Sequence, residues 1–238
     1  MAGNEQNDWN PVQVLQRRDE ATGIISLDLQ ALDGRDLPAF SAGAHIDVRL
    51  PCGLVRQYSL CNDDDERHRY RLGVLLADAS RGGSRAVHGE LHPGVRLSVS
   101  APRNLFPLVP ESRSISLIAG GIGITPLLSM AYTLEREGRA FEFHVCARDA
   151  SRVSFRQALQ QWGERVFLHL NESHDLAAPV FDPQRDIGEY KVGRFIYTCG
   201  PAGFMAFVRE SALTLGWPED AIRMEHFAAE VAKDGDGF

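Results

Sequence analysis

The period of the hydrophobic pattern changes near residue 110, and this change constrains the fold of the chain most strongly. Before it, apolar and polar residues alternate, most plainly at 25–29, 46–50 and 70–76. Alternation with a period of two predicts β-strands that are buried on one face only. Because turns rich in Gly and Pro separate these short runs, they predict a small antiparallel barrel.

Beyond a polar stretch at 108–113, predicted strands alternate with helical patterns. The strands lie at 115–119, which is a continuous apolar run, and at 141–147, 165–170 and 195–199. Strands separated by helices form βαβ units, so this part of the chain predicts a doubly wound parallel sheet.

Spacing and end signals predict three helices between these strands. We expect Thr125 to cap the first helix, with Pro126 at its first position and Gly138 at its end. The second carries Phe155, Leu159 and Trp162 and stops at Gly163, and the third carries Phe204, Val208 and Leu215 and stops at Gly216.

Length and composition narrow the class of protein. The 238 residues suffice for two small domains, and a net charge of −7 argues against nucleic-acid or anionic-membrane partners. The four cysteines, at 52, 61, 146 and 199, lack CxxC spacing, which disfavours a structural metal and a disulfide framework. Since no leader pattern or long apolar stretch is present, we expect a cytoplasmic protein.

Two glycine-rich turns each follow a predicted parallel strand, AGGIGITP at 119–126 and TCGPAGFM at 198–205. A helix N-terminus after such a turn offers free N–H groups to a pyrophosphate, and open α/β sheets bind ligands beyond the carboxyl ends of their strands. The alternative is that the glycines only allow strand and helix to pack closely. Cys199 could likewise be a small buried apolar residue.

The barrel half carries RQYSL at 56–60 and RGGS at 81–84. Arginine beside hydroxyl and glycine residues suits a phosphate and a planar ring. Taken singly, both motifs are also ordinary material for surface turns.

The order of the motifs resembles one family along residues 11–228. RQYSL, RGGS, GGIGITP, CGP and a final EHF at 225–227, together with YSLCND and PRNLFPL, are similar to the ferredoxin–NADP reductase-like superfamily. The closest likeness is to its phthalate dioxygenase reductase branch, which includes vanillate demethylase reductases. The resemblance implies a six-stranded Greek-key flavin barrel at 1–110, an α/β NAD-binding domain at 111–228, and a tail or linker at 229–238.

The resemblance implies a flavin site on the barrel. Arg56 would reach a flavin phosphate or ribityl chain, Tyr58 would pack on the ring, and Ser59 would bond its polar edge. Further flavin contacts implied are Gln57, Cys61, Asn62, Arg81, Gly82, Gly83 and Ser84, of which the last three would cradle the phosphate. The matching segments are those of the FMN branch, so FMN is preferred to FAD.

The resemblance also implies a nicotinamide site on the second half. Its residues would be Gly120, Gly121, Gly123, Thr125, Pro126, Arg148, Asp149, Cys199, Gly200 and Pro201. Asp149 would accept a ribose hydroxyl, which favours NADH over NADPH, whereas Arg148, Arg152 and Arg156 could argue for NADPH.

Three residues are implied to act in catalysis, namely Thr125, Cys199 and Glu225, and Phe227 is implied to cover the flavin. Core packing is the alternative for Phe227. The hypothesis is that NADH gives a hydride to FMN, which then releases single electrons to a [2Fe–2S] centre.

The iron–sulfur centre would lie on a missing domain or on a separate ferredoxin, because this chain has no cluster motif. The acidic, Gly-rich tail at 229–238 is typical of a linker between domains, so we expect a chain truncated before its ferredoxin domain. The final partner would be a Rieske oxygenase of aromatic-compound degradation. Alternatives are an NAD(P)H:flavin reductase, an FAD-dependent ferredoxin reductase and a non-catalytic nucleotide-binding subunit.

Overall fold

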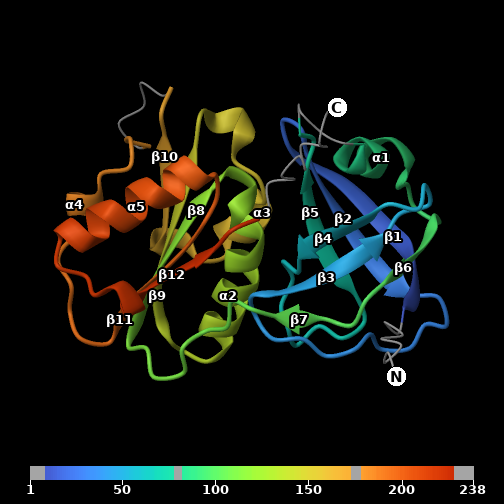
Figure 1. Cartoon of the computed structure of the whole chain (residues 1–238), viewed down its shortest axis with the longest axis horizontal. Helices are drawn as coiled ribbons and strands as arrows, with labels where there is room; N and C mark the ends of the chain where they lie inside the picture. Colours follow the sequence, from blue (N-terminus) through green and yellow to red (C-terminus); the bar gives the residue numbers. More distant parts are fainter. Residues whose placement is uncertain (1–8, 78–81, 173–177, 228–238) are drawn as a thin grey trace, which may run out of the picture.

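The computed structural model describes residues 9–77, 82–172 and 178–227, which form two sheets side by side (Figure 1). The first sheet contains β1 (Asn10–Ala21), β2 (Ile24–Ala31), β3 (Ala44–Arg49), β4 (Val55–Ser59), β5 (Tyr70–Leu75), β6 (Arg96–Val99) and β7 (Arg103–Asn104). Its strands pair antiparallel in the order β4-β3-β6-β1-β2-β5, with β7 beside β3. A bridge between Leu60 and Leu72 joins the two ends of this order, which closes the predicted barrel.

Helix α1 (Gly83–Glu90) packs beside the barrel and sends Val87 into its core. No helix is predicted there from the sequence, because eight residues rich in Gly, Ser and Arg carry little apolar periodicity. The N-cap of α1 is Gly82, whose φ of 93° is left-handed and therefore suits glycine.

Strand β2 departs from the predicted one-sided burial. Ser26 and Asp28, on the face expected to meet water, are buried as deeply as their apolar neighbours. Asp28 receives ion pairs from Arg18 at 3.0 Å, Arg69 at 3.1 Å and Arg71 at 2.7 Å. Alternation therefore identifies the strand, but it does not reveal that arginines cover its second face.

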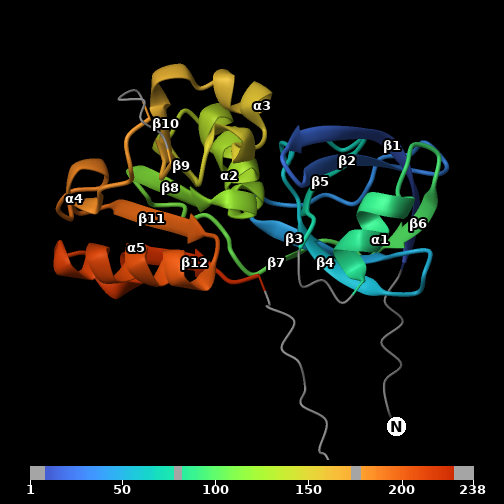
Figure 2. The same cartoon turned by 90° about the horizontal axis from the view of Figure 1, so that it is seen from above.

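The second sheet is entirely parallel and has the order β10-β9-β8-β11-β12. Its strands are β8 (Ser114–Gly120), β9 (Ala140–Ala147), β10 (Val166–Leu170), β11 (Arg194–Cys199) and β12 (Ile222–Glu225). Helices α2 (Ile124–Arg136) and α3 (Arg156–Gln160) cover one face, and α4 (Pro183–Asp186) and α5 (Ala202–Thr214) cover the other (Figure 2). The predicted doubly wound sheet is confirmed.

Two of the predicted helices differ in detail. Helix α2 begins at Ile124 after a 3₁₀ turn at Gly121–Gly123, so Thr125 lies inside it, and its hydroxyl donates to the Ile122 carbonyl at 3.1 Å instead of capping. Helix α3 is only five residues long, because the chain reaches its N-cap, Phe155, in a left-handed conformation. The predicted stops are confirmed, with φ of 64° at Gly138 and 80° at Gly216.

The connection between β7 and β8 contains the predicted domain boundary at 110/111. The Tyr197 hydroxyl of β11 donates to the Pro107 carbonyl at 2.9 Å and accepts from the Val109 N–H at 2.8 Å, so this connection is fastened to the second sheet. The exact domain limits stay a prediction, and the tail at 229–238 lies outside the described residues. None of the helices in the described ranges is long and apolar enough to cross a membrane.

Candidate functional site

The two predicted glycine turns meet where the strand order of the parallel sheet reverses. The sheet runs outward from β8 through β9 on one side and from β11 through β12 on the other, and each turn follows one of the two central strands. A Cβ on Gly200 would lie 2.9 Å from the Cα of Gly120, and a Cβ on Gly123 would collide with the Cys199 carbonyl. These glycines therefore allow two backbones to touch at the switch point, where such sheets bind ligands.

A groove of about 560 Å³ opens beyond these strand ends. Gly120, Gly121 and Pro201 lie along it, and a Cβ on Gly121 would meet nothing within 4 Å. The rest of the wall includes residues from the barrel (Thr22, Ile24, Leu75), from the ends of β9 and β10 (Cys146, Ala147, Arg148, Asn171) and from the following segments (Arg152, Val180, Phe181, Phe204, Phe207). An elongated ligand here would contact both halves of the molecule.

The barrel carries a cradle at the start of α1. Within the described residues no side chain caps this helix, and Arg56 of β4 lies so close that a Cβ on Gly83 would collide with its guanidinium. Uncapped N–H groups next to a guanidinium are suited to a phosphate. The Ser84 hydroxyl accepts from the Ala77 N–H at 3.1 Å, and predicted Arg81 lies outside the described residues.

Strand β4 connects this cradle to the switch point. Arg56 and Tyr58 share one face of the strand and are half-buried, whereas Gln57 is exposed on the other face. At the end of β4 the Ser59 hydroxyl donates to a Glu225 carboxylate oxygen at 3.2 Å. The flavin motif of the barrel and the terminal motif of the second half are thus joined across 166 residues of sequence.

The three predicted catalytic residues lie together. Cys199 and Glu225 are direct neighbours in the β11–β12 register, and Thr125 follows the turn that touches Cys199. Burial raises the pKa of Glu225 to about 7, against the lowering effect of the hydrogen bond from Ser59. Burial and the nearby Glu225 raise the pKa of the Cys199 thiol, so Cys199 is an uncharged, fully buried residue and not a thiolate nucleophile.

Three further residues predicted to contact the flavin are Cys61, Asn62 and Phe227. The Cys61 thiol lies 3.3 Å from the Arg71 carbonyl, and the Asn62 side chain accepts from the Arg71 N–H at 2.8 Å and donates to the Arg69 carbonyl at 3.2 Å. Both side chains thereby hold the loop after β4 against β5, and their contact with a flavin stays a prediction. Phe227 is 39% exposed, which opposes the alternative that it is a core residue.

The Asp149 carboxylate, which is predicted to accept a ribose hydroxyl, already accepts hydrogen bonds within its own turn. Asp149 accepts from the N–H and hydroxyl of Ser151, at 2.8 and 2.6 Å, and pairs with Arg152 at 3.4 Å. Arg148, in contrast, lines the groove and pairs with Glu172 at 3.6 Å. Asn171 and Glu172 were not predicted, although their position directly after a parallel strand is a usable signal.

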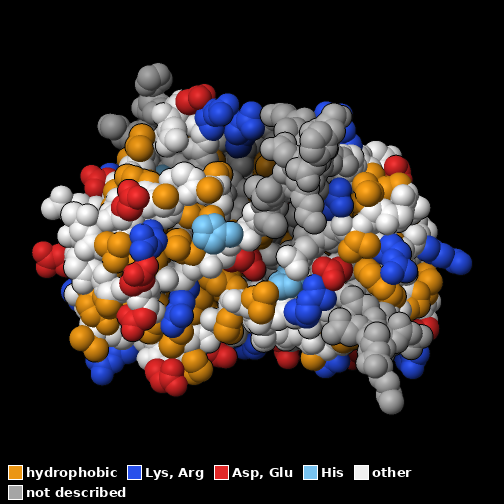
Figure 3. Space-filling model, in the orientation of Figure 1, with side chains coloured by type: hydrophobic (Ala, Val, Ile, Leu, Met, Phe, Trp, Pro, Cys, Tyr) orange, Lys and Arg blue, Asp and Glu red, His pale blue; other side chains and the backbone are white. Residues whose placement is uncertain are grey.

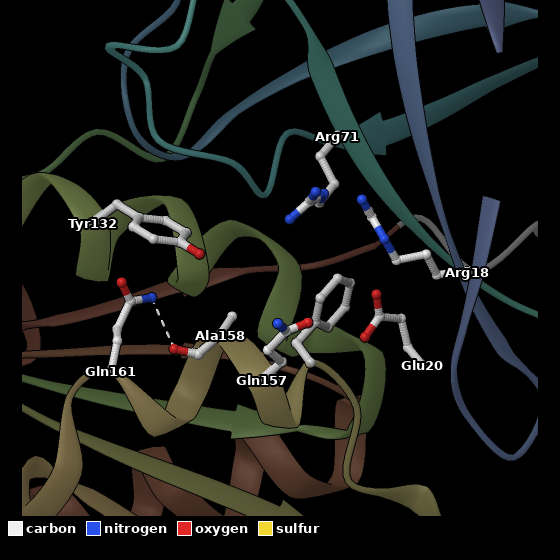
Figure 4. A pocket seen from close by; sticks show the side chains of 8 residues that line it. Arg18, Glu20, Arg71, Tyr132, Gln157, Ala158 and Gln161 are labelled. Carbon is white, nitrogen blue, oxygen red and sulfur yellow. Dashed lines mark hydrogen bonds between the residues drawn. The ribbon is translucent and has the colours of Figure 1, made fainter. Parts of the chain in front are cut away.

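A second cavity, of about 350 Å³, lies on the seam between the two halves (Figure 4). Arg18, Glu20 and Arg71 reach it from the barrel, and Tyr132 and Gln157 face them from α2 and α3. Both guanidiniums pair with Asp28, and Glu20 lines the same cavity, so two carboxylates offset the two positive charges that an anion would meet there.

The described residues fit a flavin but show no metal centre. The cradle at α1 suits its phosphate, and β4 leads from there to the polar Ser59–Glu225 pair. No group of three His, Cys, Asp or Glu side chains within the described ranges is arranged to hold a metal ion. On the face in Figure 3, Lys and Arg are interspersed with Asp and Glu and form no continuous basic patch.

Comparisons with known proteins identify the family. A scan against protein-family models finds no match. Vanillate O-demethylase oxidoreductase of Pseudomonas putida is 49% identical over 231 residues, which are 94% of this chain and 70% of that protein. The carnitine monooxygenase reductase subunit of Escherichia coli (strain K12) is 36% identical over 230 residues, or 95% of this chain and 71% of that one.

Among solved structures, phthalate dioxygenase reductase matches with a TM-score of 0.86 at 36% identity, covering 93% of this chain and 69% of that one. That protein is described as a modular structure for electron transfer from pyridine nucleotides to [2Fe–2S]. The chain therefore belongs to the family of oxygenase reductases that includes vanillate O-demethylase oxidoreductase and phthalate dioxygenase reductase.

Proposed function

We propose that this chain takes electrons from NADH, holds FMN in its barrel half, and delivers single electrons to a [2Fe–2S] centre that supplies a Rieske-type oxygenase. The observation that carries the proposal is the contact between Ser59 and Glu225. It joins the end of the flavin strand to the strand next to the nucleotide turns, so both ligands would meet at one place. A bound flavin supplies the exchange between a two-electron hydride donor and a one-electron acceptor.

The residues of this chain would bind, orient and exclude water. The N–H groups at the start of α1, with Arg56, would hold the flavin phosphate, and Tyr58 would lie along the ring. The nucleotide would lie in the groove, with its pyrophosphate at Gly121 and its nicotinamide near Thr125 and Cys199. Because neither side chain is a charged acid or base, positioning is their contribution to rate.

FMN is proposed over FAD because the barrel provides a phosphate cradle without a platform for an adenine. Residues 84–104, which include all of α1 except Gly83 and all of β6 and β7, contain no Phe, Tyr or Trp. An adenine would therefore find no Phe, Tyr or Trp in this stretch to stack on.

NADH is proposed over NADPH because each arginine of the groove already has an acidic partner. Arg148 pairs with Glu172 and Arg152 pairs with Asp149. A 2′-phosphate would have to displace one of these carboxylates, whereas a ribose hydroxyl can donate to it. The variant Glu172→Gln should therefore raise the preference for NADPH relative to NADH, with Glu219→Gln as an exposed control.

The decisive experiment combines flavin identification with nucleotide titration. Mass spectrometry of the heat-released flavin should give FMN. Anaerobic NADH should bleach the band at about 450 nm that flavins share, and a [2Fe–2S] ferredoxin added afterwards should become reduced. If neither NADH nor NADPH bleaches this band, the proposal is refuted. Loss of the flavin during gel filtration would instead indicate a flavin reductase.

The iron–sulfur and oxygenase partners are proposed from the relatives. The chain spans 70% of the vanillate O-demethylase oxidoreductase and 69% of the phthalate dioxygenase reductase, so the centre would lie on a further domain or on a separate protein. The relatives named for vanillate and for toluene-4-sulfonate suggest an oxygenase of aromatic-compound degradation. Four free thiols support a reducing compartment, the cytoplasm.

A further inference from the structure

Two histidines are buried together on the edge of the parallel sheet away from the proposed hydride path. His144 of β9 and His169 of β10 are each 2% exposed, and the His144 Nδ1 lies 3.0 Å from the His169 Nε2. The two rings are stacked, with centroids 5.3 Å apart. Neither residue is part of the site described above.

With both imidazoles neutral, only one arrangement of protons satisfies these contacts. The His169 Nδ1 lies 3.2 Å from the Pro179 carbonyl, which can only accept, so this nitrogen carries a proton. The His169 Nε2 must then accept, and the His144 Nδ1 must donate to it. The chain of hydrogen bonds therefore runs in one direction, from His144 through His169 to the Pro179 carbonyl.

The segment that this chain reaches forms part of the nucleotide groove. Val180 and Phe181 both line the groove, and Phe181 packs edge-on against His169 at 5.1 Å and His144 at 5.8 Å. The backbone at 178–181 makes no hydrogen bond with the backbone of another described residue. Two side chains bind this segment instead. His169 contacts the Pro179 carbonyl, and the Arg185 guanidinium donates to the Val180 carbonyl at 2.8 Å.

We propose that the His144–His169 pair is a positioning element for the pyridine nucleotide, which fixes the Val180–Phe181 wall of the groove through the Pro179 carbonyl. This inference rests on the proposed function, because it assigns the groove to the nucleotide. The pair touches neither the flavin cradle nor the Ser59–Glu225 contact, so it acts on binding of the nucleotide and not on the transfer step.

Burial keeps the His169 Nε2 unprotonated at neutral pH, so this chain of hydrogen bonds stays intact. Burial lowers the pKa of His169 to about 4, although Asp186 at 3.7 Å opposes that effect, and Arg185 reinforces it. The His144 Nε2 faces Glu142 at 3.9 Å, and a proton on this nitrogen would lower the pKa of Glu142, which Arg194 lowers further. A proton added at that nitrogen would leave the His144 Nδ1 donor unchanged, whereas a proton on the His169 Nε2 would break the chain.

Three variants of His169 separate the contact with Pro179 from simple packing. Asn places its amide N–H where Nδ1 lies and can still donate to the carbonyl; Gln reaches toward the place of Nε2, and Leu makes neither hydrogen bond. We expect His169→Leu and His169→Gln to raise the KM for NADH about tenfold, the loss of one buried hydrogen bond. His169→Asn should stay within about threefold of the unmodified protein, and kcat should change less than twofold in all three.

The control and a spectroscopic readout make the test independent of stability and of the proposed reaction. His68→Asn, an exposed histidine on the barrel, should leave KM unchanged. NMR of protein with ¹⁵N-labelled histidine should show His169 neutral at pH 6 with the proton on Nδ1. An Nε2-protonated His169, or equal KM values for the Asn and Gln variants, would overturn the inference; failure of NADH to reduce the unmodified protein would overturn the proposed function alone.

Discussion

Glu225 is a buried titratable side chain in contact with both halves of the molecule. Burial raises its pKa to about 7, and its hydrogen-bond partner is the Ser59 hydroxyl. Near neutral pH the carboxyl group is therefore divided between its neutral and ionised forms. The ionised form places a negative charge at the place where hydride transfer would deliver another one, so only the neutral form should favour the reaction.

We expect kcat/KM for NADH to fall as the pH rises through about 7, because Glu225 ionises in this range. Glu225→Gln keeps the shape but cannot ionise, so its profile should be flat across the same range. Stopped-flow reduction at a series of pH values measures both. An unchanged inflection in the Gln variant would show that another group titrates, and Glu219→Gln on the surface serves as the control.

Asp28 is the most deeply buried carboxylate among the ion pairs of the described residues, with a side chain 1% exposed. Burial would raise its pKa, but the hydrogen bond and charge of Arg71, with Arg69 and Arg18, bring the pKa below the ordinary 3.8. Because the pKa in the folded state is the lower one, this carboxylate stabilises the fold above about pH 4 and ceases to do so as the pH falls further.

Replacing Asp28 by Asn should cost about 3–5 kcal/mol of unfolding free energy at pH 7, because three arginines would lose their buried partner. Urea denaturation measures this loss, which should shrink below pH 4. Asp33→Asn is the matched control, since Asp33 pairs with Arg35 at an exposed site and should change stability little. Equal effects of the two substitutions would contradict the role assigned to burial.

At the scale of elements, the turns after β8 and β11 explain why a glycine is needed at some positions of these motifs and not at others. A Cβ on Gly123 would meet the Cys199 backbone, which cannot move aside. A Cβ on Gly203, in the first turn of α5, would meet nothing within 4 Å. In the sequence, Gly123 and Gly203 both stand in glycine-rich turns and look equivalent. Only the packing of β8 against β11 shows that the first must be glycine and the second need not be.

Gly123→Ala should destabilise the protein by about 1–3 kcal/mol and raise the KM for NADH, because the two turns must separate. Gly203→Ala should stabilise it by about 0.5–1 kcal/mol, since alanine is the better helix residue. Thermal unfolding and NADH kinetics of the two variants check both signs. Loss of stability in both variants would mean that the open space at Gly203 is absent in solution.

At the scale of the whole molecule, one group of close contacts between the two halves surrounds Gly73 of β5. A Cβ on Gly73 of β5 would lie 2.6 Å from the Thr125 methyl and 2.9 Å from the Phe155 ring. Phe155 is 3% exposed and has a φ of 55°, which is unusual for a residue other than glycine. The Thr22 N–H adds a bond of 2.9 Å to the Ser151 carbonyl.

Phe155→Ala should slow flavin reduction at saturating NADH about tenfold without loss of flavin, because the barrel and the turn carrying Thr125 would lose their common contact. Phe155→Leu retains most of the apolar volume and should restore most of the rate. Stopped-flow absorbance with flavin quantified beforehand measures the effect. Unchanged rates in the Ala variant would show that Phe155 does not set the geometry between the halves.

Prediction from sequence succeeded where the signal lies along the chain. The change from a period of two to strand–helix alternation gave both sheets, and Gly138 and Gly216 ended helices as expected. It missed α1 and α4 (Pro183–Asp186), which are too short to show a period, and it placed the N-terminus of α2 two residues late. Short helices depend on the surfaces that they cover, and these surfaces come from distant strands.

The sequence alone was sufficient for the class of fold, the order of the ligand motifs and the choice of glycine at left-handed turns, because each follows from neighbouring residues. The tertiary structure decided which residues meet. Ser59 and Glu225, Asp28 and its three arginines, and the chain from His144 to Pro179 depend on strand order and register. Contacts between residues far apart in sequence arise only when whole elements pack, so no local pattern specifies them.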